Sequence, residues 1–175
     1  MRKKRDGHLS CYVSALKVAR RSGKSVELGI KGILPLIAEH CVVRYDVAKQ
    51  ADKLRRWRKI ALESAQQAGR GSVPPVVPFI TLEKLFEFKP VNSKVLFLYE
   101  GNTCQGLRSV ISQSGCRSWL VVIGPEGGWS EAEASFCKQK GAVLTGLGPR
   151  VLRTETAGIA TLAAIMYEFG DLGGT

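Results

Sequence analysis

The chain has 175 residues, 45% of them apolar, and its 26 lysines and arginines outnumber 15 aspartates and glutamates, giving a formal net charge of +11. A chain of this length can bury a core without disulfide or metal staples, and no apolar run approaches the roughly 18 to 20 residues of a membrane span. The composition excludes a disulfide-stapled miniprotein, a disordered chain and a transmembrane protein, and the charge makes nucleic acid the first partner to test, ahead of an anionic membrane surface.

The positive charge is concentrated at the start of the chain. Residues 1–24 hold eight basic side chains and one acid, a net of +7, whereas the remaining 151 residues carry 18 basic and 14 acidic side chains, a net of +4. A terminal basic run of this kind is typical of a solvated tail with salt-sensitive affinity for RNA. We expect residues 1–24 to be poorly ordered and the folded domain to occupy residues 25–175.

An amphipathic helix is predicted over residues 52–68, because apolar residues recur there at spacings of three and four: Leu54, Trp57, Ala61, Ala65 and Ala68. Basic side chains fill its other faces. Such a helix is either simply solvated on its basic side or forms a rim that contacts RNA phosphates, and the sequence leaves both readings open. The candidate RNA-binding residues are Arg55, Arg58, Lys59 and, just beyond the helix, Arg70.

The rest of the chain alternates short β-rich runs with helices. Strands are predicted over residues 30–37, 95–99, 119–123 and 142–144, and they are apolar on both faces, as in a buried parallel sheet. Helices are predicted over 104–114, over a segment that opens with a Ser130–Glu133 capping box and stops at Gly141, and over 155–168. The fold class is therefore α/β, with helices on both faces of a mostly parallel sheet.

Two glycine- and proline-rich loops follow successive predicted strands. The first, residues 124–130, contains three glycines, and the second, residues 146–157, adds two arginines and an acid ahead of the last helix. Residues 98–101 would form a third wall. Because parallel strands end at the same edge of a sheet, these loops should form one crevice in which backbone approaches a ligand closely.

The sequence lacks the motifs of metal sites and of several common enzyme classes. The five cysteines are scattered without a C-x-x-C pair and only two histidines are present, so we predict no metal site and free thiols in a reducing cytoplasm. No G-x-G-x-x-G follows a strand and no G-x-S-x-G elbow occurs, which removes dinucleotide oxidoreductases and serine hydrolases of that type.

The two loops also carry a family resemblance. Residues 124–130 and 147–157, together with 27–30, 33–36, 42–44 and 57–70 upstream, resemble the RsmE-type methyltransferases of bacterial ribosomal RNA, which belong to the SPOUT superfamily. The resemblance implies methylation of N3 of a uridine in 16S rRNA of the small ribosomal subunit, with S-adenosyl-L-methionine as cofactor and no metal. It also implies a C-terminal trefoil knot, a homodimer and a cytoplasmic protein without a membrane partner.

Site residues follow from the resemblance by position. The cofactor would be lined by Leu98, Gly101, Ile123, Gly124, Gly128, Leu147, Gly148, Leu152, Arg153 and Thr156. A uracil N3 carries a proton at neutral pH, so the hypothesis is that Arg153 stabilises the uracil anion while Glu155 orients the base or accepts the proton. Alternatively, the two residues only pair to brace the knot. In this family the helix that ends at Arg70 is expected to approach the same crevice.

The chain departs from the family at its start. Family members usually begin with a β-barrel RNA-binding domain that resembles PUA modules, and we expect this barrel to be missing here. The functional alternatives are another SPOUT methylase, acting on a ribose 2'-OH, and a catalytically silent RNA-binding or ribosome-assembly factor.

Overall fold

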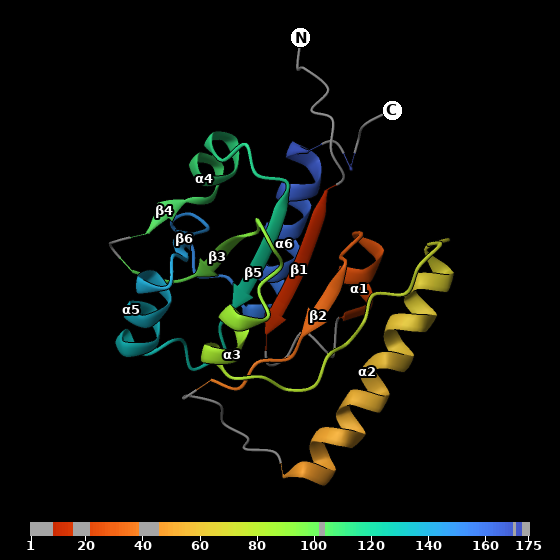
Figure 1. The fold of residues 1–175 in the computed structure, drawn as a ribbon. Helices are drawn as coiled ribbons and strands as arrows, with labels where there is room; N and C mark the ends of the chain where they lie inside the picture. Colours follow the sequence, from red (N-terminus) through yellow and green to blue (C-terminus); the bar gives the residue numbers. More distant parts are fainter. Residues whose placement is uncertain (1–8, 16–21, 39–45, 102–103, 170, 173–175) are drawn as a thin grey trace.

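The computed structural model describes residues 9–15, 22–38, 46–101, 104–169 and 171–172. Within these residues one sheet is covered by helices (Figure 1). The strands are β1 (Ser10–Ala15), β2 (Gly32–Leu34), β3 (Lys94–Leu98), β4 (Gln105–Gly106), β5 (Ser118–Ile123) and β6 (Val143–Gly146). The helices are α1 (Ser22–Glu27), α2 (Val47–Gln67), α3 (Leu82–Glu87), α4 (Leu107–Gln113), α5 (Glu131–Gln139) and α6 (Thr154–Glu168).

The sheet is parallel throughout its described pairings. The strand order is β2-β1-β5-β3-β6-β4, and the register places Val13 opposite Val121 and Phe97 between Val122 and Leu144. Parallel strands need crossover connections, and among the described residues helices lie in all of these except the one between β3 and β4. The carboxyl ends of β3, β5 and β6, three adjacent strands, meet at one edge of the sheet.

Both faces of the sheet are buried, which explains the apolar runs in the sequence. In β5, Trp119, Val121 and Ile123 pack into the cluster that includes residues of α1, α2, α4 and α6, whereas Leu120 and Val122 pack with α3 and α5. Successive side chains of a strand point to opposite faces, so a strand covered on both sides must be apolar at every position. The predicted α/β architecture with helices on both faces is confirmed.

The strand β1 lies inside the segment that the charge pattern led us to expect as poorly ordered. Cys11 and Val13 are fully buried, and β1 pairs with β2 on one side and β5 on the other. The six residues of β1 carry no charge, whereas basic side chains lie on both sides of the strand. The high net charge of residues 1–24 therefore hid the strand in the sequence. The sheet therefore begins before residue 25; residues 1–8 and 16–21, which carry most of that basic charge, lie outside the described residues.

Capping side chains set the helix starts. Asp46 accepts a hydrogen bond from the backbone N–H of Lys49 at 2.8 Å, and so α2 begins earlier than its apolar face predicts. Ser130 and Glu133 form the predicted capping box of α5, with the Glu133 N–H donating to Ser130 Oγ at 3.2 Å and the Ser130 N–H donating to Glu133 Oε2 at 2.9 Å. Because α5 starts directly after residues 124–130, this box fixes the end of that loop.

Candidate functional site

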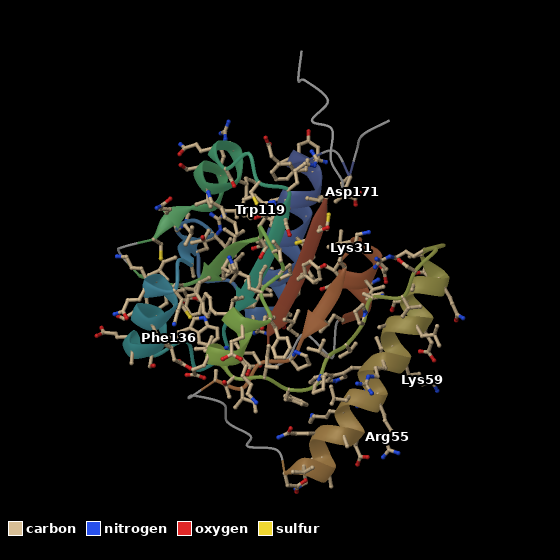
Figure 2. All side chains as sticks on the ribbon, in the orientation of Figure 1. Lys31, Arg55, Lys59, Trp119, Phe136 and Asp171 are labelled. Atoms are coloured by element: carbon tan, nitrogen blue, oxygen red, sulfur yellow. The ribbon has the colours of Figure 1, made fainter. Side chains whose placement is uncertain are left out.

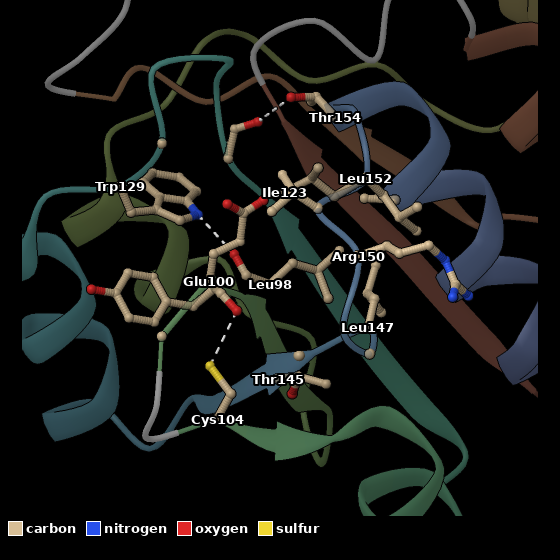
Figure 3. A pocket seen from close by; sticks show the side chains of 18 of the residues that line it. Leu98, Glu100, Cys104, Ile123, Trp129, Thr145, Leu147, Arg150, Leu152 and Thr154 are labelled. Carbon is tan, nitrogen blue, oxygen red and sulfur yellow. Dashed lines mark hydrogen bonds between the residues drawn. The ribbon is translucent and has the colours of Figure 1, made fainter.

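A pocket lies at the carboxyl edge of the sheet, where the loops after β3, β5 and β6 come together (Figure 3). Its volume is about 730 Å³, within the range of small-molecule sites. Residues 98–101, 123–125, 128–129 and 145–152 line it, together with residues of the β4 segment and the start of α6. The single crevice predicted from three separate loops is therefore present.

Hydrogen bonds tie the three loops to one another. The Thr154 hydroxyl, at the start of α6, donates to the carbonyl oxygen of Gly124 at 3.0 Å. The Trp129 indole N–H donates to the carbonyl oxygen of Leu98 at 3.1 Å, and the Trp129 ring stacks on Phe97 with centroids 4.6 Å apart. These contacts join residues about 30 positions apart in the sequence, so the pocket walls are held as one unit.

Glycines allow side chains to pack directly against the backbone around the pocket. A Cβ atom at Gly124 would lie 2.8 Å from Trp129 Nε1, and one at Gly158 would lie 2.6 Å from Ile123 Cδ1. Gly128 and Gly148 have φ angles of +74° and +109°, a region that side chains disfavour. Turn geometry thus requires glycine at positions 128 and 148, and the close contact with Trp129 requires it at position 124.

Most of the expected cofactor residues line the pocket. These are Leu98, Gly101, Ile123, Gly124, Gly128, Leu147, Gly148 and Leu152. The remaining two, Arg153 and Thr156, are exposed and are not among the lining residues. Arg153 is the N-cap residue of α6 and Glu155 is half-buried in the first turn of that helix, so both expected catalytic residues lie next to the wall rather than in it.

Sequence reasoning gave no role to several lining residues. Glu100 and Arg150 are the charged residues among those that line the pocket. Trp129 and Thr154 donate the hydrogen bonds that join its loops. Glu100 was visible as part of the third wall, but the partners of Trp129 and Thr154 are distant in the sequence and leave no local pattern.

The basic side chains of α2 lie apart from the pocket. Arg55 and Lys59 point away from the sheet (Figure 2), and they pair on the helix surface with Asp52 and Glu63 respectively. Arg58 donates to the carbonyl oxygen of Val76 at 3.3 Å. The exposed ion pairs of Arg55 and Lys59 contribute little to stability. Both cations can therefore exchange their partners for the phosphates of a polyanion.

Arg70 has a structural role that the sequence did not indicate. Its guanidinium donates to the carbonyl oxygens of Val26 at 2.8 Å and Ile30 at 2.7 Å, just ahead of β2 and therefore at the edge of the sheet opposite the pocket. Burial lowers the pKa of Arg70 from its ordinary value, while the nearby Asp171 carboxylate opposes that shift. We expected Arg70 to approach the crevice, but it is not among the residues that line the pocket. The reason is that α2 packs against α1, so the end of α2 lies beside that helix.

Among the described residues, no group of three or more histidines, cysteines, aspartates and glutamates could hold a metal ion. Within the same residues, no helix combines the length and apolar character of a membrane span.

The family model of an RNA methyltransferase domain matches residues 12–166. The chain belongs to the RNA methyltransferase family. Its curated relatives place it with the RsmE type: it is 39% identical over 150 residues to the ribosomal RNA small subunit methyltransferase E of Bacillus subtilis, a match that covers 83% of this chain and 59% of the relative. The protein of the same description from Mycobacterium bovis is 34% identical over 161 residues, covering 87% of this chain and 61% of that relative.

Solved structures agree with this membership. The ribosomal RNA small subunit methyltransferase E from Neisseria gonorrhoeae, whose crystal structure contains S-adenosyl methionine, superimposes with a TM-score of 0.83 at 32% identity, over 93% of this chain and 68% of that one. The SPOUT-type arrangement of the RNA methyltransferase domain is thereby confirmed. The chain spans about three fifths of the length of the curated relatives quoted above.

Proposed function

We propose that this RNA methyltransferase domain transfers a methyl group from S-adenosylmethionine to N3 of a uridine in 16S rRNA of the small ribosomal subunit. The observation that carries the proposal is the joining of the loops after β3, β5 and β6 into one glycine-walled pocket. The methyltransferase names of its relatives and the bound S-adenosyl methionine of the Neisseria gonorrhoeae structure support the same activity. The choice of N3 rests on the resemblance to RsmE-type enzymes.

The pocket residues fit an adenosyl cofactor. Leu98, Ile123, Leu147 and Leu152 supply apolar cover, and the glycines of the turns have no side chain to keep a ligand away from the backbone. Its volume of about 730 Å³ accommodates a ligand of that size. When bound, S-adenosylmethionine supplies a methyl group on a cationic sulfur, which is electrophilic without help from a metal.

The protein must then deal with the proton on N3. We assign Arg153 to stabilise the negative charge that develops on the base and Glu155 to orient the base or accept the proton, since both follow the pocket-lining residue Leu152 at the start of α6. A positioned base contributes about 10²- to 10⁴-fold to such a step. Arg153→Ala should retain cofactor binding by calorimetry and lose methyl transfer; a near-wild-type transfer rate would reject the assignment.

The rRNA contact is assigned to the exposed cations of α2. Arg55, Arg58 and Lys59 lie on one long helix whose apolar side is already packed, so its basic side is available for phosphates. Binding through phosphates weakens steeply with salt because counterions are released. The affinity for small-subunit rRNA should therefore fall as salt rises, and charge removal at these positions should flatten that dependence.

The assembly state is part of the same proposal. The last helix, α6, is apolar almost all round, and Tyr167 on it and Val151 ahead of it are 65% and 76% exposed. We infer that the protein is a cytoplasmic homodimer and that the partner subunit covers this surface. We also infer that the domain contains the trefoil knot of the superfamily, and that the knot contributes to the same subunit contact. Sedimentation equilibrium should give twice the chain mass, and a clean monomer would contradict the dimer.

One assay tests the activity itself. Small-subunit particles from a strain that lacks the modification would be incubated with the protein and labelled S-adenosylmethionine, and the RNA nucleosides separated by chromatography. Label in N3-methyluridine is the expected product. Label in a 2'-O-methylated nucleoside would assign ribose methylation instead, and cofactor binding without any transfer would point to a silent factor.

A further inference from the structure

Charged side chains reach the pocket wall from only two of its described lining residues, Glu100 and Arg150. They do not act as a pair: the Glu100 carboxylate points into the pocket, whereas the Arg150 guanidinium extends away from the pocket (Figure 3). The other lining residues are apolar side chains, glycines and uncharged polar groups. The interior of the pocket therefore presents one negative charge.

The backbone around Glu100 is fixed on both sides. The Leu98 carbonyl oxygen accepts the Trp129 indole N–H at 3.1 Å, and the Tyr99 N–H donates to the Thr145 carbonyl oxygen at 3.1 Å. Cys104 Sγ donates to the Tyr99 carbonyl oxygen, also at 3.1 Å. These bonds hold the segment that carries Glu100 against β6 and the loop after β5, so the backbone that places Glu100 at the pocket wall is fixed.

The Glu100 charge is available to a ligand. The ion pairs of the described residues do not include Glu100. Arg150, the other charged residue of the wall, is turned away from it. A carboxylate placed in a ligand pocket without a cation of its own favours a ligand that brings positive charge.

We propose that Glu100 makes the pocket discriminate between the cationic cofactor and its neutral product, an inference that rests on the proposed methyltransferase function. In the transfer, the S–CH₃ bond breaks as the N–CH₃ bond forms, its electron pair stays on sulfur, and the proton of N3 leaves to a base. The cofactor thus changes from a sulfonium to a neutral thioether, while its adenosine, amino and carboxylate groups stay the same. The carboxylate of Glu100 stabilises the first state and not the second, which favours exchange of product for fresh cofactor.

The size of the effect is limited by solvent. Glu100 is exposed at the pocket wall, and water screens its interaction with a ligand charge. Exposed pairs of opposite charges typically change an equilibrium constant by about two- to fivefold. We expect a shift of that size in the ratio of the two affinities.

Calorimetry with S-adenosylmethionine and S-adenosylhomocysteine tests the proposal on the wild-type chain and on Glu100→Gln. The variant should bind S-adenosylmethionine about two- to fivefold more weakly and S-adenosylhomocysteine unchanged. Glu126→Gln is the matched control, because it removes the same charge from an exposed residue of the loop after β5 that does not line the pocket. Glu100→Asp, which keeps the charge, should retain the wild-type ratio.

The outcomes separate the two claims. If Glu100→Gln weakens both ligands equally, or neither, or if Glu126→Gln changes the ratio as much, the role of Glu100 is overturned while the proposed function stands. If the wild-type chain, shown to be folded by circular dichroism, binds neither ligand, the proposed function falls and this inference with it. The proposal is supported if the ratio changes only in Glu100→Gln and if the wild-type ratio approaches that of Glu100→Gln as salt rises, because salt screens the carboxylate.

Discussion

Gly124 packs directly against the Trp129 ring, which belongs to the same loop after β5. Its backbone faces the Trp129 ring so closely that a Cβ would lie 2.8 Å from Nε1 and 3.1 Å from Cδ1, and Trp129 cannot retreat without losing its bond to Leu98. We therefore expect Gly124→Ala to destabilise the fold by about 1–3 kcal/mol and to weaken cofactor binding. Urea unfolding and calorimetry measure both effects.

A glycine in open space provides the control for that substitution. Gly71 has no atom within 4 Å of its hypothetical Cβ, so Gly71→Ala should leave binding and stability nearly unchanged. Equal losses in the two variants would show that the contact with Trp129 is not the cause.

The Thr154 hydroxyl gives a second prediction at this scale. Thr154→Val keeps the shape of the side chain but removes the donor to the Gly124 carbonyl oxygen, which should cost about 0.5–1.5 kcal/mol in the free energy of unfolding. Thr154→Ser retains the hydroxyl and should recover most of that loss. Unfolding of both variants in urea distinguishes the bond from the packing of the methyl group.

At the residue scale, the sequence predicts local requirements and misses distant partners. The glycines at 128 and 148 could be identified because turn chemistry is a property of neighbouring residues. The bonds from Trp129 to Leu98 and from Thr154 to Gly124 depend on how the strands are ordered in the sheet, and no pattern within one loop encodes that order. The same reason kept Glu100 without a role.

Among the elements, α5 shows how a cap determines a boundary. Ser130→Ala removes the oxygen that accepts the Glu133 N–H, and we expect a loss of about 1 kcal/mol in the free energy of unfolding. Ser135→Ala, at an exposed position inside the same helix, should be neutral or slightly stabilising because alanine has the higher helix propensity. If the two variants were equally stable, the capping box would contribute nothing measurable.

The contrast between α5 and β1 explains which elements the sequence revealed. The helix α5 has a cap, a stop at Gly141 with φ of +86° and an apolar face, three local signals that agree. The strand β1 is short and flanked by basic residues, and its place as the second strand from one edge of the sheet comes from pairing with β2 and β5. Its buried side chains became recognisable only once those partners were known.

For the molecule as a whole, two buried thiols predict a loss of stability at alkaline pH. Burial raises the pKa of Cys11 from 9.0 to about 12, and burial together with the Glu133 and Glu83 carboxylates does the same for Cys137. The folded state holds these protons more tightly than the unfolded state, so the stabilisation is complete below pH 9 and is lost as the pH rises from 9 toward 12. Each thiol should contribute a slope of about −1.4 kcal/mol per pH unit in that window.

Urea unfolding at a series of alkaline pH values measures this slope. The variants Cys11→Ala and Cys137→Ala should each unfold more easily at neutral pH because they leave a cavity, yet their stability should fall less steeply with pH. An unchanged slope in both variants would show that other groups dominate the alkaline transition.

The position of Trp129 turns the pocket into its own optical sensor. Of the three tryptophans, Trp57 stacks near Phe79 and Trp119 near Phe169 inside the core, whereas Trp129 lines the pocket with its indole bonded to the opposite wall. A ligand that enters changes the surroundings of that one chromophore and leaves the other two as an internal reference. Emission spectra can therefore follow occupancy in real time without a label, and Trp129→Phe is the variant in which the signal should vanish.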